Sequence, residues 1–283
     1  MVFLLLHSKT SQAGSIRYPL WAGSFYPEDS VELRKLIHTL TSQVTKPASR
    51  IPEEGLKALI LPHAGYLYSG LTTAHASLVL RKGQFDKVII LGPDHRADIE
   101  NGAISTVNNF RTPLGNITIH TAAQNLLKNN TLFNIASTSN LSEHSLEVVL
   151  PFLQYYLGSF DLTPIILGSC NTERMAESLS PLLDSDTLLV VSTDLSHYLP
   201  YDAATEKDFA TINLILQLQD KKLFTENNSA CAVYAVNTLL NLAQQNSWSP
   251  YLLHYSNSGD TAGNKDQVVG YTAIAFFANQ NEE

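Results

Sequence analysis

Three unbroken apolar runs in this chain end abruptly in polar residues that include a histidine. They lie in the segments GLKALILPHAGY, FDKVIILGPDHR and TLLVVSTDLSH, and the histidines are His63, His95 and His197. Runs of this length without polar alternation are typical of parallel strands buried on both faces. Because open α/β sheets bind ligands at the carboxyl ends of their strands, we expect a functional site where these runs end.

Helical and strand-like stretches alternate along the rest of the chain. Apolar stripes at helical spacing predict helices at about residues 30–44, 69–81, 172–183, 202–219 and 229–245. A further helix is expected from Ser142, with Pro151 kinking or splitting it. Turn residues predict a hairpin within residues 102–120, and two strands close the chain at about 251–255 and 268–277. The pattern predicts an α/β fold with a mostly parallel sheet.

Nothing in the composition divides the chain into separate domains. No Pro/Gly/Ser-rich or strongly charged linker interrupts it, so we expect one domain over residues 17–283 and a flexible extension over residues 1–16. The 283 residues are 44% hydrophobic and 16% charged, which is typical of a soluble globular protein.

Charge and cysteine content narrow the class of protein. A formal net charge of -8 argues against binding to nucleic acid or to an anionic membrane. The apolar stretch near the start is too short for a secretion signal, and no run approaches the length of a membrane span. We therefore expect a cytoplasmic protein whose two cysteines, Cys170 and Cys231, are reduced thiols.

Histidines at the ends of different strands favour a mononuclear metal site. His63 and His95 form the strongest pair, since each follows an apolar strand and lies near a glycine that permits a tight turn. Imidazole ligands favour Zn, Cu or Fe, and a thiolate would shift the preference further from Mg and Ca. Asp194 and His197, three residues apart, are candidates to orient one another or to act as acid and base.

Two further residues are candidates because of their expected place on helices. With Ser142 as N-cap, His144 lies in a first helical turn, where the helix dipole favours neutral imidazole. Cys231 is expected in the first turn of the helix over residues 229–245, which would give it thiolate character. Cys170 is interpreted as a small buried or loop cysteine, and a nucleophilic site of Cys231 with a histidine and an aspartate remains an alternative.

Several familiar templates are missing from the sequence. There is no G-x-S-x-G, no P-loop lysine and no G-x-G-x-x-G, so hydrolase-elbow, NTPase and dinucleotide-binding interpretations lack their defining parts.

Seven motifs give the chain a family resemblance that spans residue 17 to the C-terminus. They are WAGSFYP (21–27), LPHAGYLYSG (61–70), ILGPDH (90–95), RTPLGN (111–116), EHSLEVVLPFLQ (143–154), STDLSHY (192–198) and NSGDTAGNKDQVVGY (257–271). Together they resemble the Memo family, known in prokaryotes as AmmeMemoRadiSam system protein B, which is related in fold to the class III extradiol dioxygenases. The resemblance implies a single three-layer α/β/α domain around a mostly parallel, mixed sheet.

The resemblance also implies a ligand set and partners. The metal ligands would be His63, His95 and Cys231, with a further group of pocket residues in catalytic roles: His144, Asp194 and His197. It implies association with AMMECR1-domain and radical-SAM proteins, and an animal relative is a signalling adaptor that binds phosphotyrosine peptides. A cysteine would replace the glutamate ligand of the dioxygenases.

Three functional hypotheses follow. The first is an oxidoreductase that uses Fe(II), or alternatively Cu, on His63, His95 and Cys231 and acts on an unknown small molecule or peptide. The second is a non-enzymatic adaptor that kept the pocket, which the replacement of a carboxylate ligand by a thiolate motivates. The third is a zinc hydrolase with the same ligands.

Overall fold

The computed structural model of the chain describes residues 15–47, 49–137, 142–225 and 228–279. The strands of its large sheet are β2 (Leu56–Leu61), β3 (Lys87–Pro93), β4 (Gly102–Ile104), β7 (Phe133–Ile135), β8 (Asp161–Leu167), β9 (Thr187–Ser192), β10 (His197–Leu199), β11 (Trp248–Asn257) and β12 (Val268–Ala278). Among these described strands the order is β10-β12-β2-β9-β3-β8-β4-β7, and β11 pairs with β12.

The centre of the sheet is parallel, and its margins contain antiparallel pairs. β2, β9, β3 and β8 run in one direction, as Leu61 opposite Ser192 and Leu91 opposite Val191 show. β12 pairs antiparallel with β2, β10 and β11, and β4 pairs antiparallel with β8. Every residue of β9 is buried, as expected for a parallel strand covered on both faces.

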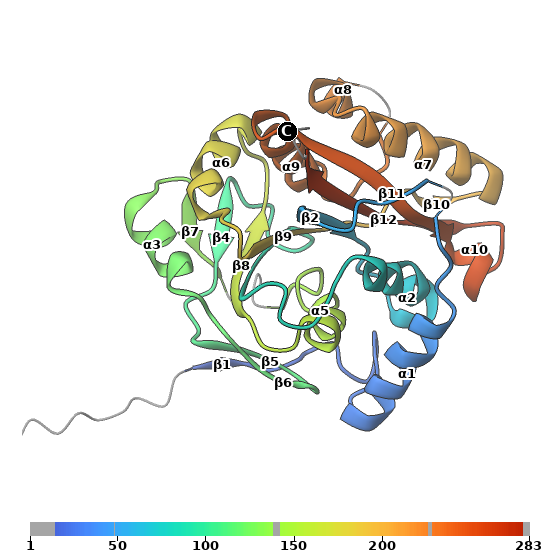
Figure 1. Cartoon of the computed structure of the whole chain (residues 1–283), viewed down its shortest axis with the longest axis horizontal. Coiled ribbons are helices and arrows are strands. Elements are labelled where there is room, and N and C mark those ends of the chain that lie inside the picture. The colour runs from blue at the N-terminus through green and yellow to red at the C-terminus, as the bar shows by residue number, and fades with distance from the viewer. Residues whose placement is uncertain (1–14, 48, 138–141, 226–227, 280–283) are drawn as a thin grey trace, which may run out of the picture.

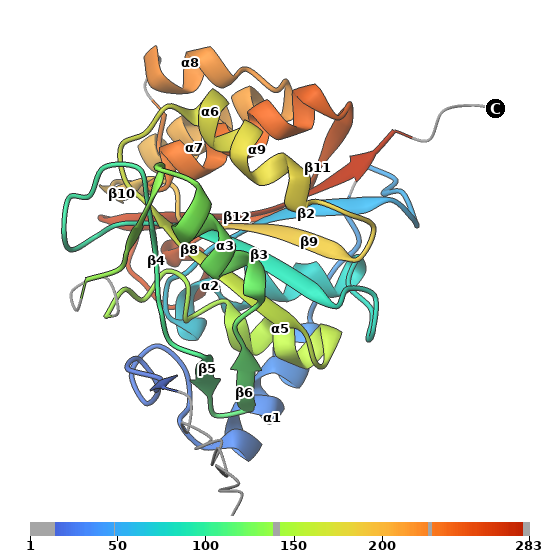
Figure 2. The same cartoon turned by 90° about the vertical axis from the view of Figure 1, so that its left-hand side faces the viewer.

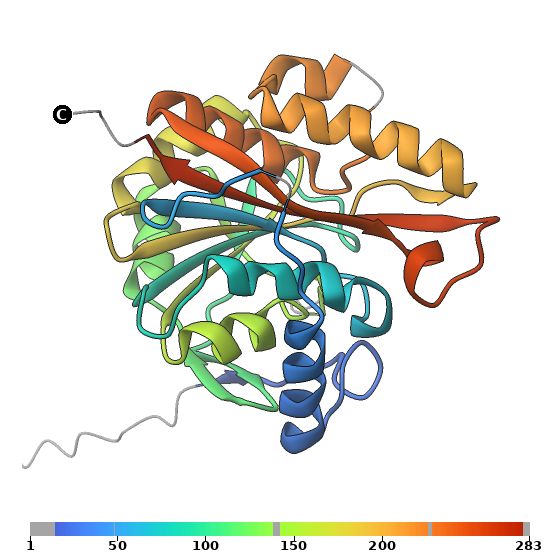
Figure 3. The ribbon, with the colours of Figure 1, turned by 45° about the vertical axis from the view of Figure 1, so that its right-hand side comes forward.

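Helices cover both faces of this sheet. They are α1 (Ser30–Ser42), α2 (Tyr66–Ala74), α3 (Thr121–Asn129), α5 (Leu150–Leu157), α6 (Thr172–Leu179), α7 (Tyr201–Leu216), α8 (Asp220–Thr225), α9 (Val233–Gln245) and the short α10 (Ser258–Thr261), with 3-10 turns η1 (His75–Leu78) and η2 (Ser180–Leu182). Helices α6 to α9 lie on one face and α1, α2 and α5 on the other (Figures 1, 2 and 3). The prediction of a three-layer α/β/α fold around a mixed sheet is therefore confirmed.

A second, three-stranded sheet lies beside the first. It has the order β1-β5-β6, formed by β1 (Ile16–Arg17), β5 (Asn109–Thr112) and β6 (Gly115–Thr118). β5 and β6 form the hairpin expected within residues 102–120. Of the predicted N-terminal extension, residues 1–14 lie outside the described residues, while Ile16 pairs with Asn109.

Four helix starts differ from the sequence predictions. Helix α2, expected from about residue 69, begins at Tyr66. The helix expected from Ser142 begins at Leu150, and Pro151 lies at its first positions, where a missing N–H costs no helical hydrogen bond. The helix expected from residue 229 begins at Val233, so Cys231 precedes it. Asp202 lies in the first turn of α7, but Pro200 occupies the N-cap.

Helix α1 begins at Ser30, as predicted, and Asp29 caps it: the Asp29 carboxylate accepts hydrogen bonds from the Val31 and Glu32 backbone N–H groups. Within the described part of the chain, helices of the length and apolarity needed to cross a bilayer are absent.

Candidate metal centre

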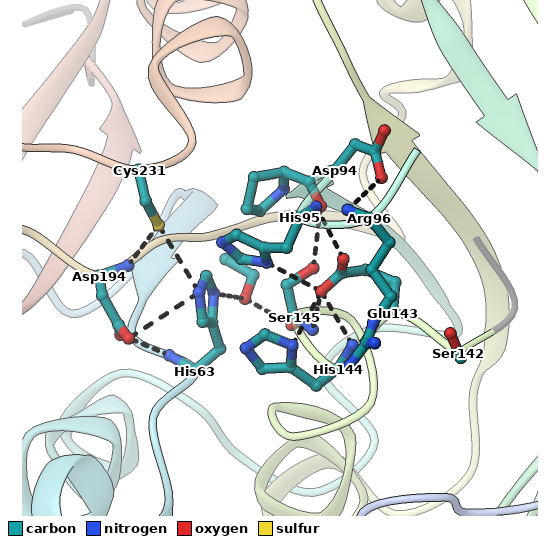
Figure 4. A network of polar contacts seen from close by, with 12 residues as sticks. His63, Asp94, His95, Arg96, Ser142, Glu143, His144, Ser145, Asp194 and Cys231 are labelled. Carbon is teal, nitrogen blue, oxygen red and sulfur yellow. Dashed lines mark hydrogen bonds and ion pairs between the residues drawn. The ribbon is translucent and has the colours of Figure 1, made fainter. Parts of the chain in front are cut away.

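The carboxyl ends of β2, β3 and β9 deliver the predicted side chains to one place. His63 follows β2, His95 follows β3 and Asp194 follows β9, while His144 comes from the turn before α5 and Cys231 from the turn before α9 (Figure 4). One ligand atom from each of His63, His95 and His144 lies within 4.8 Å of the others. Segments far apart in the sequence therefore form one cluster.

His63 is buried, and its ring nitrogens have different partners. Its Nδ1 lies 2.9 Å from Ser192 Oγ, and the Ser192 hydroxyl donates to the Ser145 carbonyl at 2.6 Å. Because that hydroxyl has only one proton to donate, Ser192 Oγ accepts from His63, and the Nδ1 of His63 carries a proton. Its Nε2 points towards Cys231 Sγ, 3.6 Å away, and Asp194 Oδ2, 3.8 Å away.

His95 is anchored by a carboxylate that the sequence analysis did not single out. Glu143 is 1% exposed, and its Oε1 lies 3.0 Å from His95 Nδ1, while its Oε2 accepts the His95 backbone N–H at 2.9 Å. The backbone N–H groups of His144 and Ser145 also donate to Oε1 of Glu143. The carboxylate thus fixes both the backbone and the ring of His95.

His144 has less defined polar contacts. Its ring stacks on His95 at a centroid distance of 4.9 Å and contacts the rings of Trp21 and Phe25. Its Nδ1 lies 3.0 Å from Glu143 Oε1 but has no hydrogen bond of acceptable geometry among the described residues. The predicted position in a first helical turn was wrong, since α5 begins six residues later at Leu150.

Asp194 and Cys231 are held to one another and to His63. The His63 backbone N–H donates to Asp194 Oδ1 at 2.9 Å, and the Asp194 N–H donates to Cys231 Sγ at 3.2 Å. The Cys231 N–H in turn donates to the Asp194 carbonyl at 3.1 Å. A groove of about 260 Å³ reaches Cys231 from the side of Asp94 and Tyr234.

The protonation equilibria of these groups are shifted in opposite directions. Burial would raise the pKa of Cys231, but charge and hydrogen bonds from His63 and His95 lower it to about 6. Burial would lower the pKa of His95, but hydrogen bonds to Cys231 and Glu143 raise it to about 10. The pKa of His63 is also raised, because Asp194 and Cys231 outweigh its burial. The site therefore stabilises positive charge beside a thiolate.

Glu143 responds to the same environment. Burial alone would raise the pKa of Glu143, but the close approach of the His144 ring and hydrogen bonds from the His95 ring and the Ser145 backbone hold that pKa well below its usual range. Glu143 is therefore an anion at neutral pH.

The described donor set fits a metal ion. It contains two imidazoles whose Nε2 atoms face a thiolate, a third imidazole with a buried nitrogen that lacks a hydrogen bond, and nearby carboxylates. This combination matches the ligands of Zn, Fe and Cu rather than those of Mg or Ca. The neighbouring anions raise the pKa values of His63 and His95 and so favour a second proton on each ring. A divalent cation would bind in place of these protons.

The structure does not bring His197 into this cluster. His197 lies in β10, is exposed, and pairs with Val269, and its ring contacts Tyr198. The backbone of Tyr198 has a φ of 59°, so the chain turns at this point. No contact between His197 and the three clustered histidines is found among the described residues.

Two other residues that can bind metals, His75 and Cys170, lie outside the cluster. His75 is buried and stacked on His254. Burial raises the pKa of Cys170 to about 11, so this thiol is protonated at neutral pH. Glu143 was the main residue missed, although it lies in the quoted motif EHSLEVVLPFLQ directly before His144.

Comparison with known proteins decides the family. The family model described as Memo-like protein matches residues 17–275. The chain belongs to the Memo family. A MEMO1 family protein of Sulfolobus acidocaldarius is 37% identical over 281 residues, covering 92% of this chain and 99% of the relative. A second, from Methanopyrus kandleri, is 35% identical and covers 92% of this chain and 98% of that protein.

Among solved structures, the chain is similar to an uncharacterized protein of Escherichia coli K12, with a TM-score of 0.48 and 12% identity. The match covers 78% of this chain and 99% of that one.

Proposed function

We propose that this Memo-family protein is a metal-dependent oxidoreductase whose iron(II) or copper ion is held by His63, His95 and Cys231. The main support is the convergence of three imidazoles, with ligand atoms within 4.8 Å, at the carboxyl ends of parallel strands. A thiolate beside two imidazoles favours a redox-active or soft metal over hard cations. This agrees with the ligand set that the family resemblance implies.

Cys231 and His144 compete for the third ligand position. Cys231 is assigned because it is largely a thiolate at neutral pH and its Sγ is 3.6 Å from the Nε2 of His63. His144 instead has a ring nitrogen without a hydrogen bond, against the half-buried rings of Trp21 and Phe25. We therefore assign His144 the role of holding or moving a proton rather than that of a ligand.

Each protein group has a distinct task in this proposal. Iron(II) or copper, when bound, supplies one-electron chemistry with O2. The Asp194 carboxylate accepts the His63 backbone N–H and so positions His63. The Asp194 backbone holds Cys231 by donating its N–H to the sulfur and by accepting the Cys231 N–H at its carbonyl. Trp21 and Phe25 cover one side of the His144 ring. His197, exposed in β10, is not assigned a role in proton transfer.

The test is metal content by mass spectrometry after anaerobic purification. Wild type, His63→Ala, His95→Ala and Cys231→Ala are compared, with His197→Ala as a matched control because it removes an exposed histidine after the same strand as Asp194. We expect near-stoichiometric iron or copper in wild type and His197→Ala, and strong loss in the other three. Oxygen consumption with candidate substrates is measured on the loaded protein.

The alternative outcomes separate the rival functions. If wild type holds neither iron nor copper after anaerobic loading, the oxidoreductase proposal falls and the adaptor hypothesis leads. If zinc is the sole native metal, the hydrolase hypothesis takes its place.

A further inference from the structure

Proton positions on His63 and His95 follow from their hydrogen bonds. The Nδ1 of His63 donates to Ser192, because the Ser192 hydroxyl proton is committed to the Ser145 carbonyl. The Nδ1 of His95 donates to Glu143 Oε1, because that oxygen already accepts two backbone N–H groups and has no proton to donate. Both rings therefore turn their Nε2 atoms towards the same region (Figure 4).

Both carboxylate oxygens of Glu143 accept hydrogen bonds. Its Oε2 accepts from the His95 backbone, while its Oε1 accepts from the His95 ring and from the backbone N–H groups of His144 and Ser145. All four groups are donors. A glutamine would place its own NH2 against at least one of them, so a charge-neutral substitute of the same shape cannot satisfy the set.

We infer that Glu143 is a positioning residue that orients the His95 ring with Nε2 towards the metal centre and thereby sets the affinity of that centre for a divalent metal. The affinity half of this inference rests on the proposed function. The orientation half concerns the metal-free protein and stands on the hydrogen bonds alone. Removing a carboxylate that orients a ligating histidine typically weakens metal binding by about 10- to 100-fold.

Glu147 offers a matched control one turn further along the chain. It is also a buried carboxylate, and its four partners are donors: Arg17 Nη1 at 2.7 Å, the Tyr26 hydroxyl at 2.6 Å, and the backbone N–H groups of Leu20 and Trp21. None of these four contacts involves a histidine. Glu147→Gln therefore removes the same charge without removing a hydrogen-bond partner of the His95 ring.

The experiment measures Zn(II) affinity by competition with a chelator, together with thermal unfolding, for wild type, Glu143→Gln and Glu147→Gln. We expect Glu143→Gln to bind Zn(II) about 10- to 100-fold more weakly. Glu147→Gln is expected to lower the melting temperature by leaving Arg17 without its carboxylate, with unchanged affinity while folded. Equal affinity for wild type and Glu143→Gln, or equal loss in both variants, overturns the inference.

A second measurement on metal-free protein needs no metal binding. With ¹⁵N-labelled histidine, proton NMR of wild type is expected to show a slowly exchanging His95 Nδ1–H, assigned by its loss in His95→Gln. The His95 Nδ1–H signal is expected to persist in Glu147→Gln and to vanish in Glu143→Gln. If Glu143→Gln does not fold, wild type alone decides: absence of the signal from wild type overturns the inference. Failure of wild type to bind any metal overturns the proposed function and leaves this readout intact.

Discussion

The chain contains two histidine clusters with opposite electrostatic behaviour. In the metal centre, a carboxylate and a thiolate raise the pKa of His95 to about 10. In the pair His75 and His254, with ring centroids 3.9 Å apart, burial and the neighbouring histidine lower the pKa of His254 to about 4. Neighbouring buried anions thus favour charged imidazole in the candidate metal centre, whereas burial without anions favours neutral imidazole in the second pair.

The partners of the second pair explain the difference. His75 Nδ1 donates to the Leu71 carbonyl, and His254 Nδ1 contacts the Thr72 hydroxyl, both of which are neutral. The pair serves packing between α2, η1 and β11. The metal centre instead has Glu143, Asp194 and Cys231 in direct contact with its imidazoles.

The largest predicted effect concerns the two thiols of the metal-free protein. The alkylation rate of Cys231 by iodoacetamide should rise as pH increases through about 6, whereas Cys170, with its pKa raised to about 11, stays mostly protonated. Near pH 7 we expect Cys231 to react roughly a hundredfold faster or more, since the thiolate is the nucleophile. Mass spectrometry of the modified peptides measures both rates.

His63→Ala provides the control for this reactivity. Without the imidazole, the pH at the midpoint of the Cys231 alkylation profile should rise towards the ordinary cysteine pKa of about 8.5. An unchanged midpoint would contradict the view that imidazole charge creates the thiolate.

The next effect is structural and tests the anion beside His63. Asp194→Ala removes the acceptor of the buried His63 backbone N–H, which should lower the free energy of unfolding by about 1–3 kcal/mol. Urea denaturation measures the change. Asp184→Asn is the control: it breaks an ion pair of an exposed carboxylate with Lys87, and such pairs contribute only about 0–1 kcal/mol. Equal effects of the two substitutions would show that Asp194 does not stabilise this turn.

The smallest predicted effect is a pH dependence of folding stability that the His75–His254 pair contributes. The pKa of His254 is about 4 in the folded state against 6.5 ordinarily, so the unfolded chain binds the proton first as pH falls. The pair's contribution to stability is therefore complete above about 6.5 and decreases as pH falls towards about 4. The stability difference between wild type and His254→Gln, from urea denaturation, should narrow from pH 7 to pH 5. A constant difference would contradict the assignment.

The sequence was sufficient for the fold and for the location of the site, because uninterrupted apolar runs identify buried parallel strands. His63, His95 and Asp194 follow directly from the ends of such runs. Glu143 could not be predicted in the same way. It lies in a turn that has the apolar spacing of a helix, and its role depends on backbone N–H groups whose directions only the folded turn defines.

Two other residues show where local reasoning reached its limit. Cys231 was expected to be a thiolate through the dipole of its own helix, but α9 begins at Val233 and the lowered pKa comes from His63 and His95. His197 was expected in the pocket; it lies exposed in β10, which pairs with β12, and its described ring contact is with Tyr198. Both outcomes depend on segments distant in sequence, which local spacing does not encode.

The assignment of Cys231 rather than His144 as the third ligand is tested most directly by anaerobic Co(II) loading and absorption spectroscopy. We predict a thiolate-to-cobalt charge-transfer band in wild type and in His144→Ala, and its loss in Cys231→Ala. A cobalt-loaded wild type without the band, or a Cys231→Ala variant that retains it, would contradict the assignment and leave the three histidines as the metal site.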